Sequence, residues 1–140
     1  MAKAASTMGR ATSSTIFKEA KAFSSFAVND LQQAKEFYGR TLGLRISEQP
    51  EGLALNLPNG NSVFLYPKPN HTPASFTVLN FQVEDIEEVV DGLKSLGVRM
   101  ERYNQPDLQT DERGIHQGAR GPTIAWFKDP AGNILSVMEE

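Results

Sequence analysis

The sequence contains no cysteine. Disulfide frameworks, thiolate nucleophiles and cysteine-ligated zinc or iron–sulfur sites are therefore excluded. The absence of cysteine is compatible with a reducing compartment, so we expect a cytoplasmic protein.

Long apolar runs and an excess of basic residues are also missing. No apolar stretch approaches the roughly 18 residues that a membrane-spanning helix needs. The 14 basic and 17 acidic residues give a net charge of −3, whereas a nucleic-acid-binding domain usually carries a basic face. We therefore expect neither a membrane nor a nucleic-acid partner. The 140 residues, 39% of them hydrophobic, fit one soluble, globular binding protein or small enzyme.

Histidine is scarce, with two residues in the chain. His71 lies in the proline-rich stretch 67–73, and we interpret it as a linker residue. His116 has the chemistry of a general base, or of a chance metal ligand beside Asp111 and Glu112, but no nearby pattern orients it. No glycine-rich phosphate loop and no Gly-x-Ser-x-Gly motif is present.

The first 20 residues differ in composition from the rest. They are rich in Ala, Ser and Thr, and no acidic residue precedes Glu19. This composition resembles a transit peptide; a disordered tail, or a start at Met8, are the alternatives. We treat residues 1–20 as an N-terminal tail and residues 21–140 as one module.

The module contains an internal repeat. Three pairs of segments match: FSSFAVNDL (23–31) with VLNFQVEDI (78–86), LGLR (42–45) with LGVR (96–99), and PNGN (58–61) with PAGN (130–133). The offset slips by one residue within the predicted helix. The sequence therefore predicts two copies of one unit, at 21–70 and 75–140. The second copy has about 17 additional residues, which we place between Arg99 and Ile124.

Each unit is predicted to consist of a strand, a helix and three strands. Alternating residues before Asp30 and Asp85 indicate strands. These two aspartates are N-cap candidates for helices with apolar residues at helical spacing, which Gly43 and Gly97 end. A short strand is expected after each glycine, followed by a hairpin.

The hairpin turns set which side chains share a face of the sheet. Asp-Pro-Ala-Gly at 129–132 fits a type I turn followed by a glycine bulge, which pairs Trp126 with Ser136. In the first unit, the same turn type pairs Ala54 with Phe64. A two-residue turn would shift these pairings by one residue.

These segments resemble the vicinal oxygen chelate superfamily, which includes glyoxalases, bleomycin-resistance proteins and extradiol dioxygenases. The matching segments are FAVNDL (26–31), FY (37–38), TLGL (41–44), VEDI (83–86) and FKDPAGN (127–133), and the resemblance covers about residues 23–140. It implies an α+β fold in which two βαβββ units form a cup-shaped, half-open sheet. It also implies a small-molecule site on the concave face and a homodimer.

Metal enzymes of this superfamily bind a divalent ion through the first and last strands of each unit. The resemblance places these positions at Phe23, Phe64, Val78 and Ser136. Phenylalanine and valine cannot ligate a metal, and a neutral hydroxyl is a weak ligand. We therefore expect no metal and no other cofactor.

The predicted concave face is aromatic with a few hydrogen-bonding groups, as a site for a small organic ligand requires. The predicted ligand-binding residues are Phe23, Ser25, Phe64, Tyr66, Asn80, Gln82, Trp126, Ser136, Tyr103 and His116. Val78, Lys128 and Met138 are expected on the same face. The alternative is that the aromatic residues fill the cup as a core, although its polar groups would be costly without partners.

Tyr103 and His116 belong to the additional segment, residues 103–122. Segments of this length are lids, binding loops or disordered. We predict that it folds over the cup and brings Tyr103, Arg113, His116 or Arg120 to a ligand. A mobile, solvated loop is the alternative.

Three functions fit this sequence. The first, which we favour, is metal-independent binding of a small, planar organic molecule, as in sequestration of a drug or toxin. Bleomycin itself is disfavoured, because it is cationic and the predicted face carries Lys128 and no acid. The second is a glyoxalase-like lyase or isomerase, or a dioxygenase, with non-standard or no metal ligands, using Tyr66, Lys128 or His116. The third is a non-catalytic interaction module with a filled cup.

Overall fold

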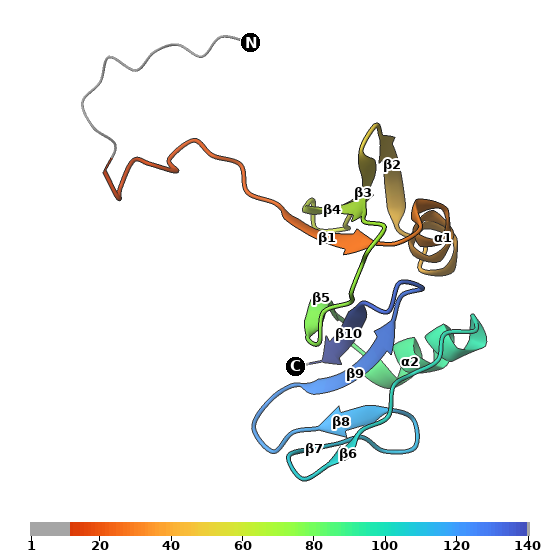
Figure 1. Ribbon diagram of the computed structural model, residues 1–140. Helices are drawn as coiled ribbons and strands as arrows, with labels where there is room; N and C mark the ends of the chain where they lie inside the picture. Colours follow the sequence, from red (N-terminus) through yellow and green to blue (C-terminus); the bar gives the residue numbers. More distant parts are fainter. Residues whose placement is uncertain (1–11, 140) are drawn as a thin grey trace, which may run out of the picture.

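The computed structural model describes residues 12–139, so residues 1–11 of the predicted tail lie outside it (Figure 1). The first unit comprises strand β1 (Ser24–Val28), helix α1 (Leu31–Lys35), its continuation η1 (Glu36–Thr41), and strands β2 (Arg45–Gln49), β3 (Gly52–Asn56) and β4 (Ser62–Pro67). The second comprises β5 (Thr77–Gln82), α2 (Ile86–Ser95), β6 (Asn104–Gln105), β7 (Leu108–Gln109), β8 (Ile115–Gln117), β9 (Thr123–Lys128) and β10 (Ile134–Glu139).

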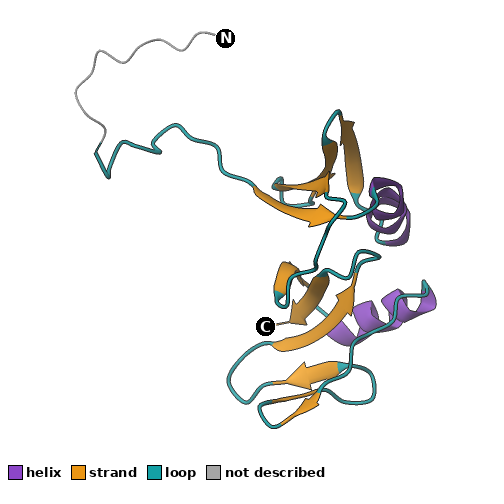
Figure 2. Cartoon of the chain, viewed as in Figure 1, coloured by secondary structure: helices purple, strands orange, loops and turns teal. Residues whose placement is uncertain are grey.

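The two four-stranded sheets have the same topology. Their strand orders are β1-β4-β3-β2 and β5-β10-β9-β8, and the first strand of each unit pairs in parallel with the last. Figure 2 shows α1 and α2 on the same side of the two sheets. The predicted α+β fold of two βαβββ units is therefore confirmed. No helix within residues 12–139 is long and apolar enough to cross a membrane.

The predicted helix caps are present. Asp30 Oδ1 accepts the backbone N–H groups of Gln32 and Gln33 at 2.9 and 3.1 Å, and Asp85 Oδ1 accepts that of Glu88 at 3.1 Å. The first helix differs from the second because η1 is π-helical. The additional residue of the first repeat lies in this π-helical turn, which is a common way for an α-helix to accommodate an inserted residue.

Residues of both units form one apolar core. It contains Leu55 and Leu65 of the first sheet, Phe127 and Leu135 of the second, and Val90 of α2, all at most 1% exposed. Burying these side chains is the main favourable contribution to folding. The two units are therefore packed together through the helix-facing sides of their sheets.

A buried hydrogen-bond network also joins the units. The Tyr38 hydroxyl of η1 donates to Asp129 Oδ2 at 2.7 Å. Asn133 Nδ2 donates to the same oxygen at 3.0 Å and to the Ala27 carbonyl of β1 at 2.8 Å. Asp129 Oδ1 accepts the backbone N–H groups of Ala131 and Asn133 at 2.9 and 2.8 Å. One carboxylate thus holds η1 and the β9–β10 turn in place.

The strand expected directly after Gly97 is reduced to a single bridge. Met100 bridges to Phe127, and the Glu101 N–H donates to the Trp126 carbonyl at 2.8 Å. The chain then leaves the sheet and returns at β8, which continues along β9 with Ile115 opposite Ala125. The segment between them, 102–114, includes the β6–β7 hairpin. Residues 103–122 are therefore not wholly solvated, because Ile115 is buried in the core and anchors a strand.

Candidate functional site

The strand registers place most predicted site residues on the sheet faces opposite the helices, which we call the open faces. Phe64 pairs with Ala54 and Trp126 with Ser136, as the turn types predicted, and Phe64 also pairs with Ser25 of β1. The neighbours of Phe64, Val63 and Leu65, belong to the core, so Phe64 points away from it.

Three ring side chains gather on the open face of the second sheet, and we call Tyr103, His116 and Trp126 the aromatic platform. The Tyr103 ring meets the Trp126 ring edge-on, with centroids 5.5 Å apart and an interplanar angle of 82°. The His116 ring lies 6.2 Å from Trp126. Each pair has the spacing at which aromatic rings attract one another. The three rings are inclined to one another and together offer aromatic surface to a ligand.

Hydrogen bonds orient two of the three rings of this platform. Trp126 Nε1 donates to Thr77 Oγ1 at 3.2 Å. His116 Nδ1 donates to the Gln109 carbonyl at 2.7 Å, which leaves Nε2 as the other polar atom of the ring. Burial, helped by the charge of Glu101, raises the pKa of Tyr103. Its hydroxyl therefore stays protonated at neutral pH and can donate a hydrogen bond.

Polar groups lie beside the platform on β10 and β5. The Ser136 side chain is fully buried and its Oγ bonds to Asn80 Oδ1 at 2.5 Å. Asn80 and Gln82 are exposed. The amide of Asn80 keeps its two N–H donors for a ligand, because the bond to Ser136 uses its oxygen.

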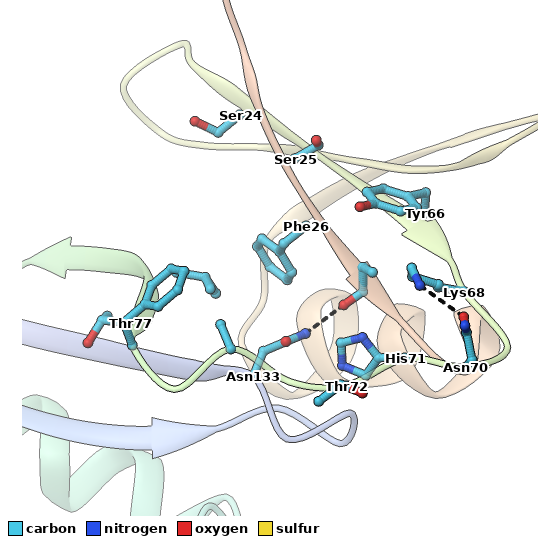
Figure 3. Close-up of a pocket in the computed structure, with 14 residues that line it drawn as sticks. Ser24, Ser25, Phe26, Tyr66, Lys68, Asn70, His71, Thr72, Thr77 and Asn133 are labelled. Atoms are coloured by element: carbon cyan, nitrogen blue, oxygen red, sulfur yellow. Dashed lines mark hydrogen bonds between the residues drawn. The ribbon is translucent and has the colours of Figure 1, made fainter.

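The predicted residues of the first sheet line two separate hollows. Phe23 and Phe64 line one of about 340 Å³ with Ala54. Ser25 and Tyr66 line a cavity of about 510 Å³ at the junction of the two units (Figure 3). The ten predicted residues therefore do not meet in a single cavity of the described chain, and their role in binding stays a prediction.

Val78 is not on the open face as expected. Thr77 pairs with Ile134 and Leu79 with Leu135, so Val78 is an additional residue in β5 that forms a bulge. Its side chain packs against the core. Simple alternation from Asn80 placed it wrongly, because a bulge shifts the side-chain order by one residue.

Only part of the additional segment reaches the open face. Tyr103 and His116 do so, whereas Arg113 turns to α2 and forms ion pairs with Glu87 at 2.9 Å and Asp91 at 2.6 Å. Its hydrogen bonds to these carboxylates raise the pKa of Arg113. Arg120 is exposed. Arg113 is thus held on the outer surface and does not approach the platform, whereas contact of Arg120 with a ligand stays a prediction.

The residues at the superfamily's metal positions do not fit a metal ion. Phe23 and Phe64 have no donor atom, Val78 is bulged and apolar, and the Ser136 hydroxyl is already bonded to Asn80. Within residues 12–139, no three His, Cys, Asp or Glu side chains are grouped closely enough to hold a metal.

Sequence reasoning missed several polar residues at the junction. Thr77, which bonds Trp126, and Lys68 and Thr72 of the linker line the cavity with Ser25. His71, interpreted only as a linker residue, lines it too. The lack of acidic residues in the linker was the one sequence signal for these residues. The position of the linker, however, depends on how the two units pack.

Comparison with known proteins agrees with the fold. Residues 22–137 match the family model described as glyoxalase/bleomycin resistance protein/dioxygenase superfamily. No curated protein matches the chain. A glyoxalase family protein from Enterococcus faecalis is similar in structure, with a TM-score of 0.64 and 22% identity over 89% of this chain and all of that one.

Two other solved structures are similar. The fosfomycin resistance protein FosX from Listeria monocytogenes has a TM-score of 0.65 and 13% identity over 87% of this chain and 93% of its own. TnmS3, an antibiotic binding protein from Streptomyces sp. CB03234, has a TM-score of 0.56 and 22% identity over 86% and 97%. The family match spans both units, and the chain therefore belongs to the glyoxalase/bleomycin resistance protein/dioxygenase superfamily.

Proposed function

We propose that this protein binds a small, planar organic ligand on its open faces without a metal ion. The aromatic platform carries the proposal, because three adjoining rings, two of them held by hydrogen bonds, offer stacking surface beside the exposed amides of Asn80 and Gln82. Apolar surface with a few polar anchors suits small-molecule recognition. Structural neighbours named for antibiotic binding and fosfomycin resistance support sequestration of a drug or toxin as the biological role. A cytoplasmic location belongs to the proposal and is supported by the lack of cysteine.

Metal independence rests on the donor atoms available. The superfamily's metal positions hold two phenylalanines, a bulged valine and a serine engaged with Asn80. Stacking and hydrogen bonding need no Lewis acid, so the platform can bind a ligand with the groups it has.

The test is a thermal-shift screen of planar aromatic compounds and divalent metals, with and without chelator. A compound that binds only the folded protein raises its melting temperature. We expect compounds that raise the melting temperature by the same amount with and without chelator.

Trp126→Leu should weaken the binding of such a compound about tenfold, because an aromatic pair contributes roughly 0.5–1.5 kcal/mol beyond the burial of its area. The matched control is Phe17→Leu, an exposed phenylalanine outside both sheets. Equal weakening by both variants would reject the platform as the site.

We also propose that a second copy of the chain completes the cup. Phe23 is 69% exposed, and burial of its ring against a second copy favours association. Sedimentation should give twice the chain mass of 15.4 kDa. Phe23→Asp should shift the protein to the monomer, whereas Leu96→Asp, at an exposed leucine that ends α2, should not. A wild-type protein that sediments as a monomer at every concentration would refute this arrangement.

A further inference from the structure

The linker between the units lines an open cavity that is separate from the aromatic platform. β1 and β5 are edge strands of their sheets, and residues 68–76 connect β4 to β5. The resulting cavity has a volume of about 510 Å³, within the usual range for small-ligand sites. Figure 3 shows Tyr66, Lys68, His71 and Thr72 around this space.

The charge of this cavity favours an anion. Its lining contains the Lys68 ammonium but no aspartate or glutamate, although the whole chain has more acidic than basic residues. The Lys68 ammonium donates to the neutral amide oxygen of Asn70 at 2.9 Å, and among residues 12–139 no carboxylate lies within ion-pair distance of it. The ammonium therefore has charge and N–H donors to offer a ligand.

Hydroxyl groups and a fixed imidazole ring lie around this charge. His71 Nε2 lies 3.2 Å from the Ala131 carbonyl, and a carbonyl only accepts, so this nitrogen donates its proton within the protein and the ring is fixed in position. The hydroxyls of Ser25, Thr72 and Tyr66 line the same space. A carboxylate has two oxygens that accept several hydrogen bonds, which matches a cavity rich in donors.

Two rings at the cavity add a surface for a planar group. Tyr66 is 37% exposed and Phe76 is 67% exposed, and both line the cavity. Stacking another aromatic ring against an exposed ring is energetically favourable. We propose that the junction cavity is a second binding site, selective for an aromatic carboxylate whose ring lies against Tyr66 and Phe76 and whose charge lies at Lys68.

The two histidines allow this site to be distinguished from the platform. His71 lines the junction cavity and His116 belongs to the platform, and the chain has no other histidine. The fluorescence of the single tryptophan is less selective, because Trp126 bonds to Thr77, which also lines the cavity. Imidazole proton resonances, assigned with His71→Gln, therefore report on each site separately.

The experiment is an NMR titration of the full chain with benzoate, and with benzamide as an uncharged probe of similar shape. Benzoate should shift the His71 resonances in a saturable manner, and benzamide should bind at least about fivefold more weakly. Lys68→Met should weaken benzoate about fivefold, the effect of losing one exposed ion pair. Lys94→Met removes the same charge from the exposed surface of α2 and should change the affinity less than twofold.

Three results would overturn the proposal. One is that neither histidine shifts up to the solubility limit of benzoate. Another is that benzoate shifts His116 alone, which would leave binding at the platform intact and reject the junction site. The third is equal weakening by Lys68→Met and Lys94→Met, which would mean that only the net charge matters. Circular dichroism of both variants should match the wild type, because both lysines are exposed.

Discussion

Replacing Asp129 by alanine is expected to lower the free energy of unfolding by about 3–5 kcal/mol, a large part of the roughly 5–15 kcal/mol that stabilises a typical domain. The Asp129 carboxylate is 5% exposed and accepts four hydrogen bonds. Its removal leaves the Tyr38 hydroxyl and two backbone N–H groups buried without a partner, and each such group costs about 1–3 kcal/mol. Tyr38 would also lose its bond across the two units.

Urea unfolding of the wild type, Asp129→Ala and Asp107→Ala measures this effect. Asp107 is an exposed aspartate in the β6–β7 hairpin, so its loss should change stability by less than about 0.5 kcal/mol. Asp129→Asn keeps the shape and should cost less than alanine. If Asp129→Ala unfolds at the same urea concentration as Asp107→Ala, the network does not hold the units together.

Stability is also expected to fall steeply above pH 10 because of Tyr38. Burial, with the charge of Asp129 beside it, raises the pKa of Tyr38 far above its ordinary value of 10.0. Above pH 10 the unfolded chain loses the phenol proton while the folded chain keeps it, so the folded state binds more protons. The stability from this group is complete below pH 10 and declines by about 1.4 kcal/mol per pH unit above it.

Urea unfolding at pH 9, 10 and 11 tests this dependence (pH values roughly bracketing the free phenol). Tyr38→Phe should be less stable at pH 9, because it lacks the bond to Asp129, but should lose less stability as the pH rises. Tyr103→Phe is the matched control. The pKa of Tyr103 is also raised, but its ring is only half-buried, so this substitution should change the pH dependence of stability less than Tyr38→Phe does. The same slope in Tyr38→Phe and the wild type would contradict the role of Tyr38.

The repeated pattern made the two units predictable. Asp30 and Asp85 mark equivalent helix caps, and Pro130 with Gly132 fixes the register that pairs Trp126 with Ser136. The one-residue slip between the copies lies in η1, where a π-helical turn takes up the additional residue. These features depend on neighbours in sequence, which is why residue spacing was enough to find them.

Features that depend on contacts between distant segments were not predictable. Tyr38 fits the apolar stripe of its helix, and nothing near it in sequence indicates a bond to Asp129, 91 residues away. The bulge at Val78 leaves no sequence signal, and alternation placed that residue on the wrong face. The course of the linker past β1 likewise follows from packing, so the roles of Lys68 and His71 emerged only in the structure.

Within the additional segment, some side chains reach the open face of the second sheet and others turn away from it. Tyr103 and His116 lie at Trp126. Arg113 does not, because Glu87 and Asp91 of α2 hold it at the outer surface. A list of residue types in a loop cannot distinguish these directions, since both arginine and the rings have the chemistry to bind a ligand.

The most direct measurement is calorimetric titration of the strongest planar hit into chelator-treated protein, repeated with a saturating divalent metal and with Trp126→Leu. We expect the same dissociation constant with and without metal, and about tenfold weaker binding to Trp126→Leu. Binding that requires the metal, or that is unchanged in Trp126→Leu, would contradict a metal-independent site at the aromatic platform.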